Sequence, residues 1–243
     1  MDIEALGGLR VRENGVLLVP AEPHARQVLA VLAAHADQLV PASVLAGELA
    51  VHTPAERTRA VLHACVRQLR DLLAGAADPR GRRTPEAVLV SRPGGYLLDT
   101  GGGRSDLDEF TRDAGAGYRA MARGDFETAA RRLRGALALW RGPAFDGVVA
   151  GPRIAERIDG LERTRRSVLT QWVEARLALG RHRELRTELR TGGIRRALEA
   201  HRQLADALGV GPGAGTGVGS GSGPGGEDSA REVRRALLRG AAV

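Results

Sequence analysis

The sequence predicts a mainly helical protein with a small amount of β-structure, and its 243 residues are enough for two domains. Three observations support this fold class. Aromatic residues make up only 3% of the chain, so the cores must consist mainly of Ala, Leu and Val, which favours helices. Apolar residues recur at helical spacing in several segments. Two turn sequences, Asn-Gly and Pro-Gly-Gly, stand between short apolar runs, as in β-hairpins.

Residues 1–22 contain the first of these turns. Apolar residues before Glu13-Asn14-Gly15 and at 16–19 after it predict a β-hairpin. Pro23 then begins a helix, because its fixed φ suits a first helical turn, and a second short helix follows. The apolar side chains expected on their buried faces are Val28, Leu29, Leu32 and Ala33 in the first helix and Val44, Leu45 and Leu49 in the second.

A third helix is predicted over residues 55–74, after the break at Thr53-Pro54. Its inner stripe consists of Leu62, Val66, Leu69 and Leu73. A polar loop over 75–85 leads to Val88-Leu89-Val90 and Tyr96-Leu97-Leu98, which flank the Pro-Gly-Gly turn and predict a second hairpin. This order of strands, three helices and a final hairpin resembles that of a winged helix-turn-helix domain.

The outer face of the 55–74 helix is the candidate DNA-binding site. Arginine can bond two acceptors of guanine in the major groove, and small residues let a helix approach the bases closely. His63 is a candidate base or phosphate contact, and Arg92 at the hairpin tip is placed to reach a phosphate or the minor groove. The predicted DNA-binding residues are Arg57, Arg59, Ala60, His63, Ala64, Arg67, Arg70 and Arg92. An ordinary amphipathic helix with a solvated basic face is the alternative.

The charge distribution favours DNA binding over that alternative. Every basic residue other than histidine is an arginine, because the chain contains no lysine. Residues 1–56 hold 3 Arg and 7 acidic residues, whereas residues 57–92 hold 8 Arg and 3 acidic residues. Positive charge confined to one helix and the loop after it is a stronger indication of nucleic-acid binding than overall basicity.

Residues 104–208 are predicted to form a second, α-helical domain built like tetratricopeptide repeats. Gly124-Asp125-Phe126 is a turn between two helices, Trp140-Arg141-Gly142-Pro143 ends the second of them, and a long helix follows. The turns at Gly180 and Gly193 are 13 residues apart, whereas a full repeat needs about 34, so this domain is shortened. Residues 209–227 predict a flexible Gly, Ser and Pro linker, and 228–243 a short terminal helix and tail.

Several function classes are excluded or disfavoured. Without lysine there is no P-loop and no lysine Schiff base, and the six histidines show no metal-ligand spacing, so we expect no enzyme, cofactor or metal. A single cysteine, Cys65, excludes an intrachain disulfide. No apolar run approaches the roughly 18 residues of a membrane helix, and the N-terminus lacks a signal-peptide pattern, so we expect a cytoplasmic protein without membrane contact.

These features together resemble the Streptomyces antibiotic regulatory protein family, whose members pair an OmpR-type winged helix with a bacterial transcriptional activation domain. The matching residues are Arg59, Leu62, Leu69-Arg70, Arg92-Pro93-Gly94-Gly95-Tyr96-Leu97, Asp106, Phe110, Ala136-Leu137-Ala138-Leu139-Trp140-Arg141-Gly142-Pro143, Ala178-Leu179-Gly180-Arg181-His182 and Glu184-Leu185. The resemblance covers residues 3–190 and 193–209. It implies a winged-helix domain over 1–100 and an activation domain over 104–208.

The resemblance also implies a function. Members activate secondary-metabolite gene clusters, bind direct repeats of double-stranded promoter DNA near the −35 element, and recruit RNA polymerase holoenzyme through its sigma factor and alpha subunit, often as homodimers on DNA. This chain differs from the usual pattern in having Pro41 at a helix cap, Ala50 in place of Trp, and Cys65 and Arg67 in the third helix. The remaining alternatives are a protein-interaction adaptor with a degenerate winged helix and a ligand sensor built on the helical repeats.

Overall fold

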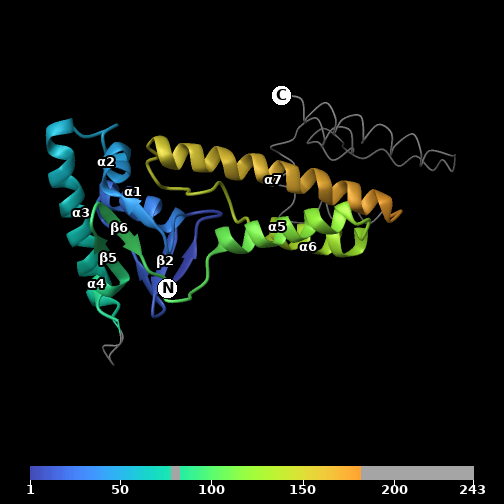
Figure 1. Cartoon of the computed structure of the whole chain (residues 1–243), viewed down its shortest axis with the longest axis horizontal. Helices are drawn as coiled ribbons and strands as arrows, with labels where there is room; N and C mark the ends of the chain where they lie inside the picture. The colour runs from blue at the N-terminus through green and yellow to red at the C-terminus, as the bar shows by residue number, and fades with distance from the viewer. Residues whose placement is uncertain (78–82, 182–243) are drawn as a thin grey trace, which may run out of the picture. The chain divides into compact units, whose positions relative to one another are not determined.

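The computed structural model describes residues 1–77 and 83–181, which are mostly helical with small sheets (Figure 1). By their contacts they form two compact units. The first unit comprises Met1–Glu109 and Arg141–Glu162, and the second comprises Phe110–Trp140 and the described residues from 163 to 181. The predictions for Gly193, for the linker over 209–227 and for the terminal helix over 228–243 lie outside the described residues.

The first unit opens with a three-stranded antiparallel sheet of β1 (Asp2–Glu4), β2 (Arg10–Glu13) and β3 (Val16–Leu18), in that order. Asn14 and Gly15 join β2 to β3 with φ angles of 50° and 81°. Two successive left-handed residues match the twist of a tight hairpin, so the hairpin predicted from Asn-Gly is confirmed. The Asn14 amide also donates to the carbonyl of Ala76 at the end of the third helix, at 3.0 Å.

Three helices follow: α1 (Pro23–Ala34), α2 (Ala42–Leu49) and α3 (Ala55–Gly75). The inner stripe of α3 is confirmed, since none of its four predicted side chains is more than 4% exposed. Two expectations were too narrow or wrong. Helix α1 buries nearly every residue from Ala25 to Ala33 and not one face alone. On α2, Leu45 and Leu49 are buried as expected, but Val44 is only half-buried and Glu48 is buried in its place.

A second sheet holds the final hairpin, with strand order β4 (Leu39–Pro41), β6 (Gly95–Leu98) and β5 (Leu89–Arg92). The hairpin is confirmed, but β4 was not expected, because its partner β6 is distant in the sequence. Gly95 is required here, since a Cβ at this position would overlap the carbonyl oxygen of Val40.

A one-turn helix, α4 (Pro85–Val88), replaces the end of the predicted polar loop. Thr84 caps it by accepting from the amide of Ala87 at 3.3 Å, and Pro85 occupies its first turn. The strand expected to begin at Val88 therefore begins one residue later, at Leu89.

The second unit contains the greater part of α5 (Asp106–Ala122), α6 (Phe126–Ala138) and the later turns of α7 (Pro152–Ala178). The turn predicted at Gly124 is confirmed, with a φ of 71°. Asp125 caps α6 by accepting from the amide of Thr128 at 3.1 Å, and this bond holds the pKa of Asp125 below its usual value. Gly117 allows α5 to approach α6 closely, because a Cβ there would overlap the side chain of Leu133.

An aromatic cluster forms the core of the second unit. The rings of Phe110 and Trp140 meet edge to face with centroids 5.5 Å apart. The guanidinium of Arg165 lies 4.4 Å from the centroid of the Trp140 ring. Trp172 on α7 is fully buried. The two tryptophans thus supply much of the apolar area in a unit otherwise built from Ala, Leu and Val.

Candidate nucleic-acid interface

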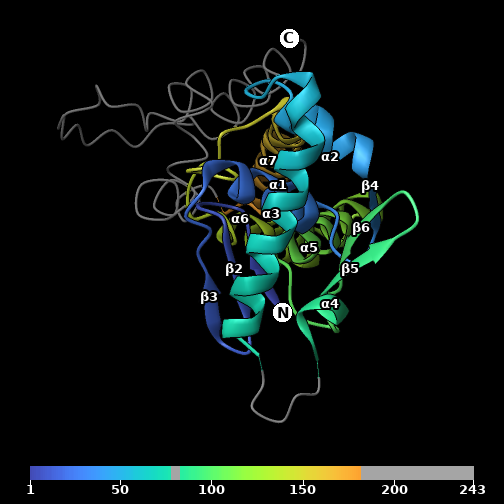
Figure 2. The same cartoon turned by 90° about the vertical axis from the view of Figure 1, so that its left-hand side faces the viewer.

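Helix α3 presents the candidate site on the face opposite its buried stripe. Six of the seven residues predicted on this helix have exposed side chains: Arg57, Arg59, Ala60, His63, Ala64 and Arg67. The acidic residues Glu56 and Asp71 are exposed on the same helix. Figure 2 shows α3 facing the viewer, with the β5–β6 hairpin projecting beside it. We call the six residues the α3 outer face.

Arg70 differs from these six, because it is half-buried and its guanidinium is bound within the fold. Its Nε and Nη2 donate to the carbonyl of Leu89 at 3.3 and 2.8 Å, and Nη2 also donates to the Ser91 hydroxyl at 2.9 Å. Both acceptors lie on β5. Arg70 therefore holds the hairpin against α3, a role that helical periodicity could not predict.

Arg92 ends β5, where it pairs in register with Gly95, and its side chain is exposed. Gly94 completes the turn with a φ of 84°. The predicted hairpin arginine thus stands at the hairpin tip, on a strand that Arg70 fixes to α3 through the preceding residue, Ser91. The backbone of Arg92 is fixed by strand pairing, whereas its exposed side chain can adopt different rotamers.

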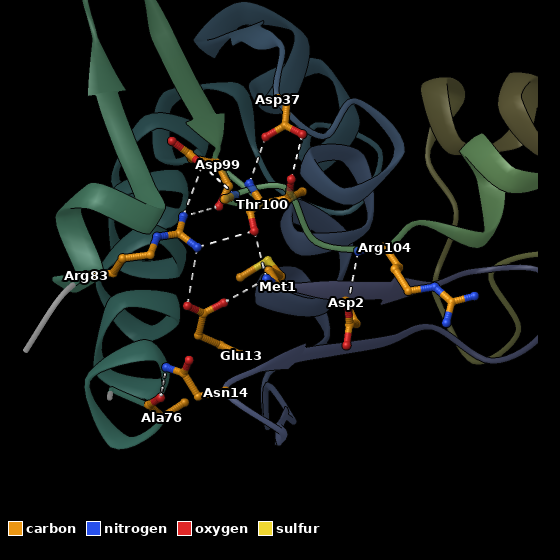
Figure 3. Close-up of polar contacts among 11 residues, drawn as sticks. Met1, Asp2, Glu13, Asn14, Asp37, Ala76, Arg83, Asp99, Thr100 and Arg104 are labelled. Carbon is orange, nitrogen blue, oxygen red and sulfur yellow. Dashed lines mark hydrogen bonds and ion pairs between the residues drawn. The ribbon is translucent and has the colours of Figure 1, made fainter. Parts of the chain in front are cut away.

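Arg83 contributes to the basic stretch in the sequence but not to its free charge. Its Nη1 lies 3.5 Å from Oε1 of buried Glu13, and its Nη2 donates to Oδ1 of Asp99 at 3.1 Å. The same nitrogens donate to the carbonyls of Asp99 and Thr100 (Figure 3). Counting residues 57–92 as one basic surface was therefore wrong for Arg83, because its charge is neutralised by acids from the first sheet and the end of β6.

The same cluster fixes the chain where it leaves the hairpin. Both carboxylate oxygens of Asp37 accept from Thr100, one from its amide and one from its hydroxyl, each at 2.7 Å (Figure 3). Asp37 follows α1 and has a φ of 61°. The base of the hairpin is thus bound to the turn after α1 and to β2, and the hairpin is attached to the domain at both its base and its side.

Cys65 and the histidines of the described residues are not grouped as metal ligands. Cys65 lies on the inner side of α3, where burial raises the pKa of its thiol to about 11. Over residues 1–77 and 83–181, no three His, Cys, Asp or Glu side chains are grouped as metal ligands. No helix within these same residues is long and apolar enough to cross a membrane.

Sequence reasoning missed the role of the segment after Trp140, which it interpreted only as the end of a helix. Arg141, Phe145 and Asp146 donate their amides to the carbonyls of Leu6, Ala5 and Gly7 at 2.7, 2.8 and 3.0 Å. The segment thereby extends the first unit beside β1. Phe145 is 1% exposed and completes the core there.

Asp106 fastens this same segment from the first turn of α5. Its carboxylate accepts from the amides of Ala5 and Leu6 at 2.9 to 3.1 Å and from Nη2 of Arg141 at 2.6 Å. Asp106 is 6% exposed. Asp106 and Arg141 both appeared in the motifs of the resemblance, but their 35-residue separation concealed that they are partners.

Known proteins with related sequences are transcriptional regulators. Residues 105–195 match the model of the bacterial transcriptional activator domain. The regulatory protein DnrI of Streptomyces peucetius is 37% identical over 189 residues, which are 78% of this chain and 70% of that protein. The transcriptional regulatory protein EmbR of Mycobacterium tuberculosis is 33% identical over 190 residues, but this chain spans only 47% of EmbR.

The fold agrees with a solved structure of the same relative. The structure of Mycobacterium tuberculosis EmbR in complex with a low-affinity phosphopeptide matches with a TM-score of 0.68 and 27% identity, covering 98% of this chain and 65% of that one. The relatives are regulatory proteins and not enzymes, in agreement with the expectation from sequence. The identity to DnrI over most of both chains and the activator-domain match together show that this chain belongs to the Streptomyces antibiotic regulatory protein family of transcriptional regulators.

Proposed function

We propose that the protein activates transcription by binding double-stranded promoter DNA, with the α3 outer face in the major groove and Arg92 against a neighbouring phosphate or the minor groove. The observation that carries this proposal is the joint geometry of α3 and the hairpin. The α3 outer face carries three exposed arginines and two exposed alanines, and Arg70 bonds that helix to the strand that bears Arg92. A rigid pair of elements can contact base edges and backbone at the same time.

The finer parts of the proposal rest on family membership. We propose that the winged-helix domain spans residues 1–100 and the shortened activation domain spans 104–208. The target is a set of direct repeats near the −35 element of a secondary-metabolite gene cluster, bound by a homodimer that recruits RNA polymerase through its sigma factor and alpha subunit. Footprinting on the promoters that flank the protein's own gene tests the target.

A salt titration tests the DNA-binding proposal directly. Binding of the full chain to a labelled promoter duplex is measured by fluorescence anisotropy between about 50 and 200 mM salt. Because each neutralised phosphate releases counterions, log K should fall linearly with log salt, and by about 10³-fold or more for six or more contacts. Absent binding, or binding insensitive to salt, would overturn the proposal.

Three variants separate the roles of the arginines. Arg67→Ala should reduce discrimination between promoter and unrelated duplex, because Arg67 is proposed to contact bases. Arg92→Ala should weaken binding to both duplexes alike and reduce the salt slope by about 1. Arg112→Ala, an exposed arginine on α5, is the matched control and should change neither quantity. If Arg67→Ala leaves specificity and affinity intact, α3 does not lie in the groove as proposed.

A further inference from the structure

Glu48 on α2 is a polar residue in an unexpected place, since it is only 1% exposed. A buried carboxylate must be matched by hydrogen-bond donors or by a positive charge. Glu48 is matched by backbone amides and not by an arginine of the described residues. All of these amides belong to the segment that begins α7, more than 100 residues later in the chain.

Three bonds join the Glu48 carboxylate to that segment. Oε1 accepts from the amide of Gly151 at 2.7 Å and from that of Ile154 at 3.3 Å, and Oε2 accepts from the amide of Arg153 at 2.8 Å. Pro152, between them, has no amide hydrogen to satisfy. Glu48 thus occupies every donor from Gly151 to Ile154, the amides that a helix N-terminus leaves without internal partners.

Two further features show that Glu48 and Gly151 are tightly packed and that the backbone of Glu48 is held in place. A Cβ at Gly151 would lie 2.5 Å from the carbonyl oxygen of Glu48 and 2.8 Å from its Oε1, so only glycine allows the approach. The same Glu48 carbonyl accepts from Nε2 of buried Gln27 on α1 at 2.9 Å. The carboxylate also lies at the positive end of the α7 dipole, which strengthens these bonds.

We infer that Glu48 is a positioning residue that fixes the first turn of α7 to the DNA-binding unit. Helix α2 packs against both α1 and α3. Helix α7 is continuous from its first turn, in the first unit, to its later turns, in the second unit, and all of it lies within residues 105–195, which match the activator-domain model. Glu48 therefore connects α2, which packs against α3, with a helix of the matched activator domain. This role rests on the proposed function, because it concerns activation by the DNA-bound protein.

Two variants release this clamp from opposite sides. Glu48→Gln keeps the size of the side chain but replaces one acceptor oxygen with an amide group and removes the charge. Gly151→Ala keeps the carboxylate and pushes it away. Glu156→Gln is the matched control, since Glu156 lies on the same helix, its side chain is 71% exposed, and its ion pair with Arg153 is a surface contact. Circular dichroism establishes the temperature range in which each variant is folded, and all measurements are made within it.

Hydrogen exchange and transcription are then compared. In both clamp variants the amides of Gly151, Arg153 and Ile154 should exchange at least about tenfold faster than in the wild type, because the charge-assisted bonds that protect them are lost. Affinity for the promoter duplex should stay within about twofold. Transcription from that promoter in vitro, at protein concentrations that saturate the DNA, should fall about fivefold or more, a typical size for coupling between sites. Glu156→Gln should match the wild type in all three.

Each contrary result overturns a defined part of the inference. Unchanged exchange at 151–154 in both variants would overturn the clamp itself. Faster exchange with full transcription at saturation would overturn its role in activation, and so would a loss of DNA affinity as large as the loss of transcription. Failure of the wild-type chain to bind DNA would overturn the proposed function and the activation role with it, whereas the exchange comparison would still decide the clamp.

Discussion

Asp106 should be among the residues on which the stability of the first unit depends most. Asp106→Ala removes the acceptor of the Ala5 and Leu6 amides and the partner of Arg141. Ala5 and Leu6 are 0% exposed, so water cannot replace the lost acceptor without opening the structure. Asp108, two residues later in the same helical turn, has an exposed side chain and provides the control.

The expected loss can be worked from these contacts. Each buried amide left without a partner costs about 1–3 kcal/mol. The Arg141 side chain is 42% exposed, so its ion pair adds only about 0–1 kcal/mol. Two such amides and the ion pair together predict that Asp106→Ala destabilises the first unit by about 2–7 kcal/mol. Asp106→Asn, which keeps one acceptor oxygen, should lose less.

Urea unfolding followed by circular dichroism measures the change, with Asp108→Ala in parallel. The control removes the same charge near the α5 N-terminus and should cost no more than about 1 kcal/mol. A loss of less than about 1 kcal/mol in Asp106→Ala, or an equal loss in Asp108→Ala, would refute the structural role of the Asp106 carboxylate. Either result would mean that the buried amides find another acceptor or that helix-end charge alone accounts for the effect.

Three other variants test further contacts of the first unit. Arg70→Ala should lower the free energy of unfolding by about 1–2 kcal/mol and weaken promoter binding, because the hairpin loses its bonds to α3. Fluorescence anisotropy measures the loss of binding, with Arg112→Ala as the control. Gly95→Ala should destabilise the second sheet, because the new Cβ overlaps a backbone carbonyl, and thermal unfolding measures the loss. Gly47→Ala is the control and should be tolerated, because no atom lies within 4 Å of a Cβ at that position. Burial raises the pKa of the Cys65 thiol from 9.0 to about 11, so the stability that depends on the neutral thiol is present below pH 9 and is lost as the pH rises. The loss in free energy of unfolding between pH 9 and pH 11 should be about 2 kcal/mol. Urea unfolding across this range should show a shallower decline for Cys65→Ala than for the wild type, and parallel curves would contradict the role of burial.

The elements that sequence predicted correctly are those whose cause is local. Asn14-Gly15 adopts the left-handed backbone that a tight hairpin needs, so the first hairpin follows from two residues. The inner stripe of α3 follows from helical spacing alone, and that stripe also determines which side chains face outward. The exposure of six of the seven candidate DNA-contacting residues on α3 therefore follows from the same spacing, and Arg70 is the exception.

The elements that sequence missed depend on a partner elsewhere in the chain. Strand β4 exists because β6 pairs with it, and β6 begins more than 50 residues later. Arg70 and Arg83 look like their neighbours in the sequence, yet one is bonded to β5 and the other is neutralised by Glu13 and Asp99. Charge counting treats all arginines as equal, and only their surroundings separate surface charges from structural ones.

The sequence by itself determined that this chain has a helix with an apolar stripe on one side and arginines on the other, followed by a hairpin with an arginine at its tip. Periodicity and turn chemistry act over a few neighbouring residues, so they can be recognised in the sequence alone. Only the tertiary structure decided that Glu48 and Asp106 are buried at the start of α7 and beside β1. A carboxylate can be buried only where enough amides converge on it, and that convergence joins residues about 100 positions apart.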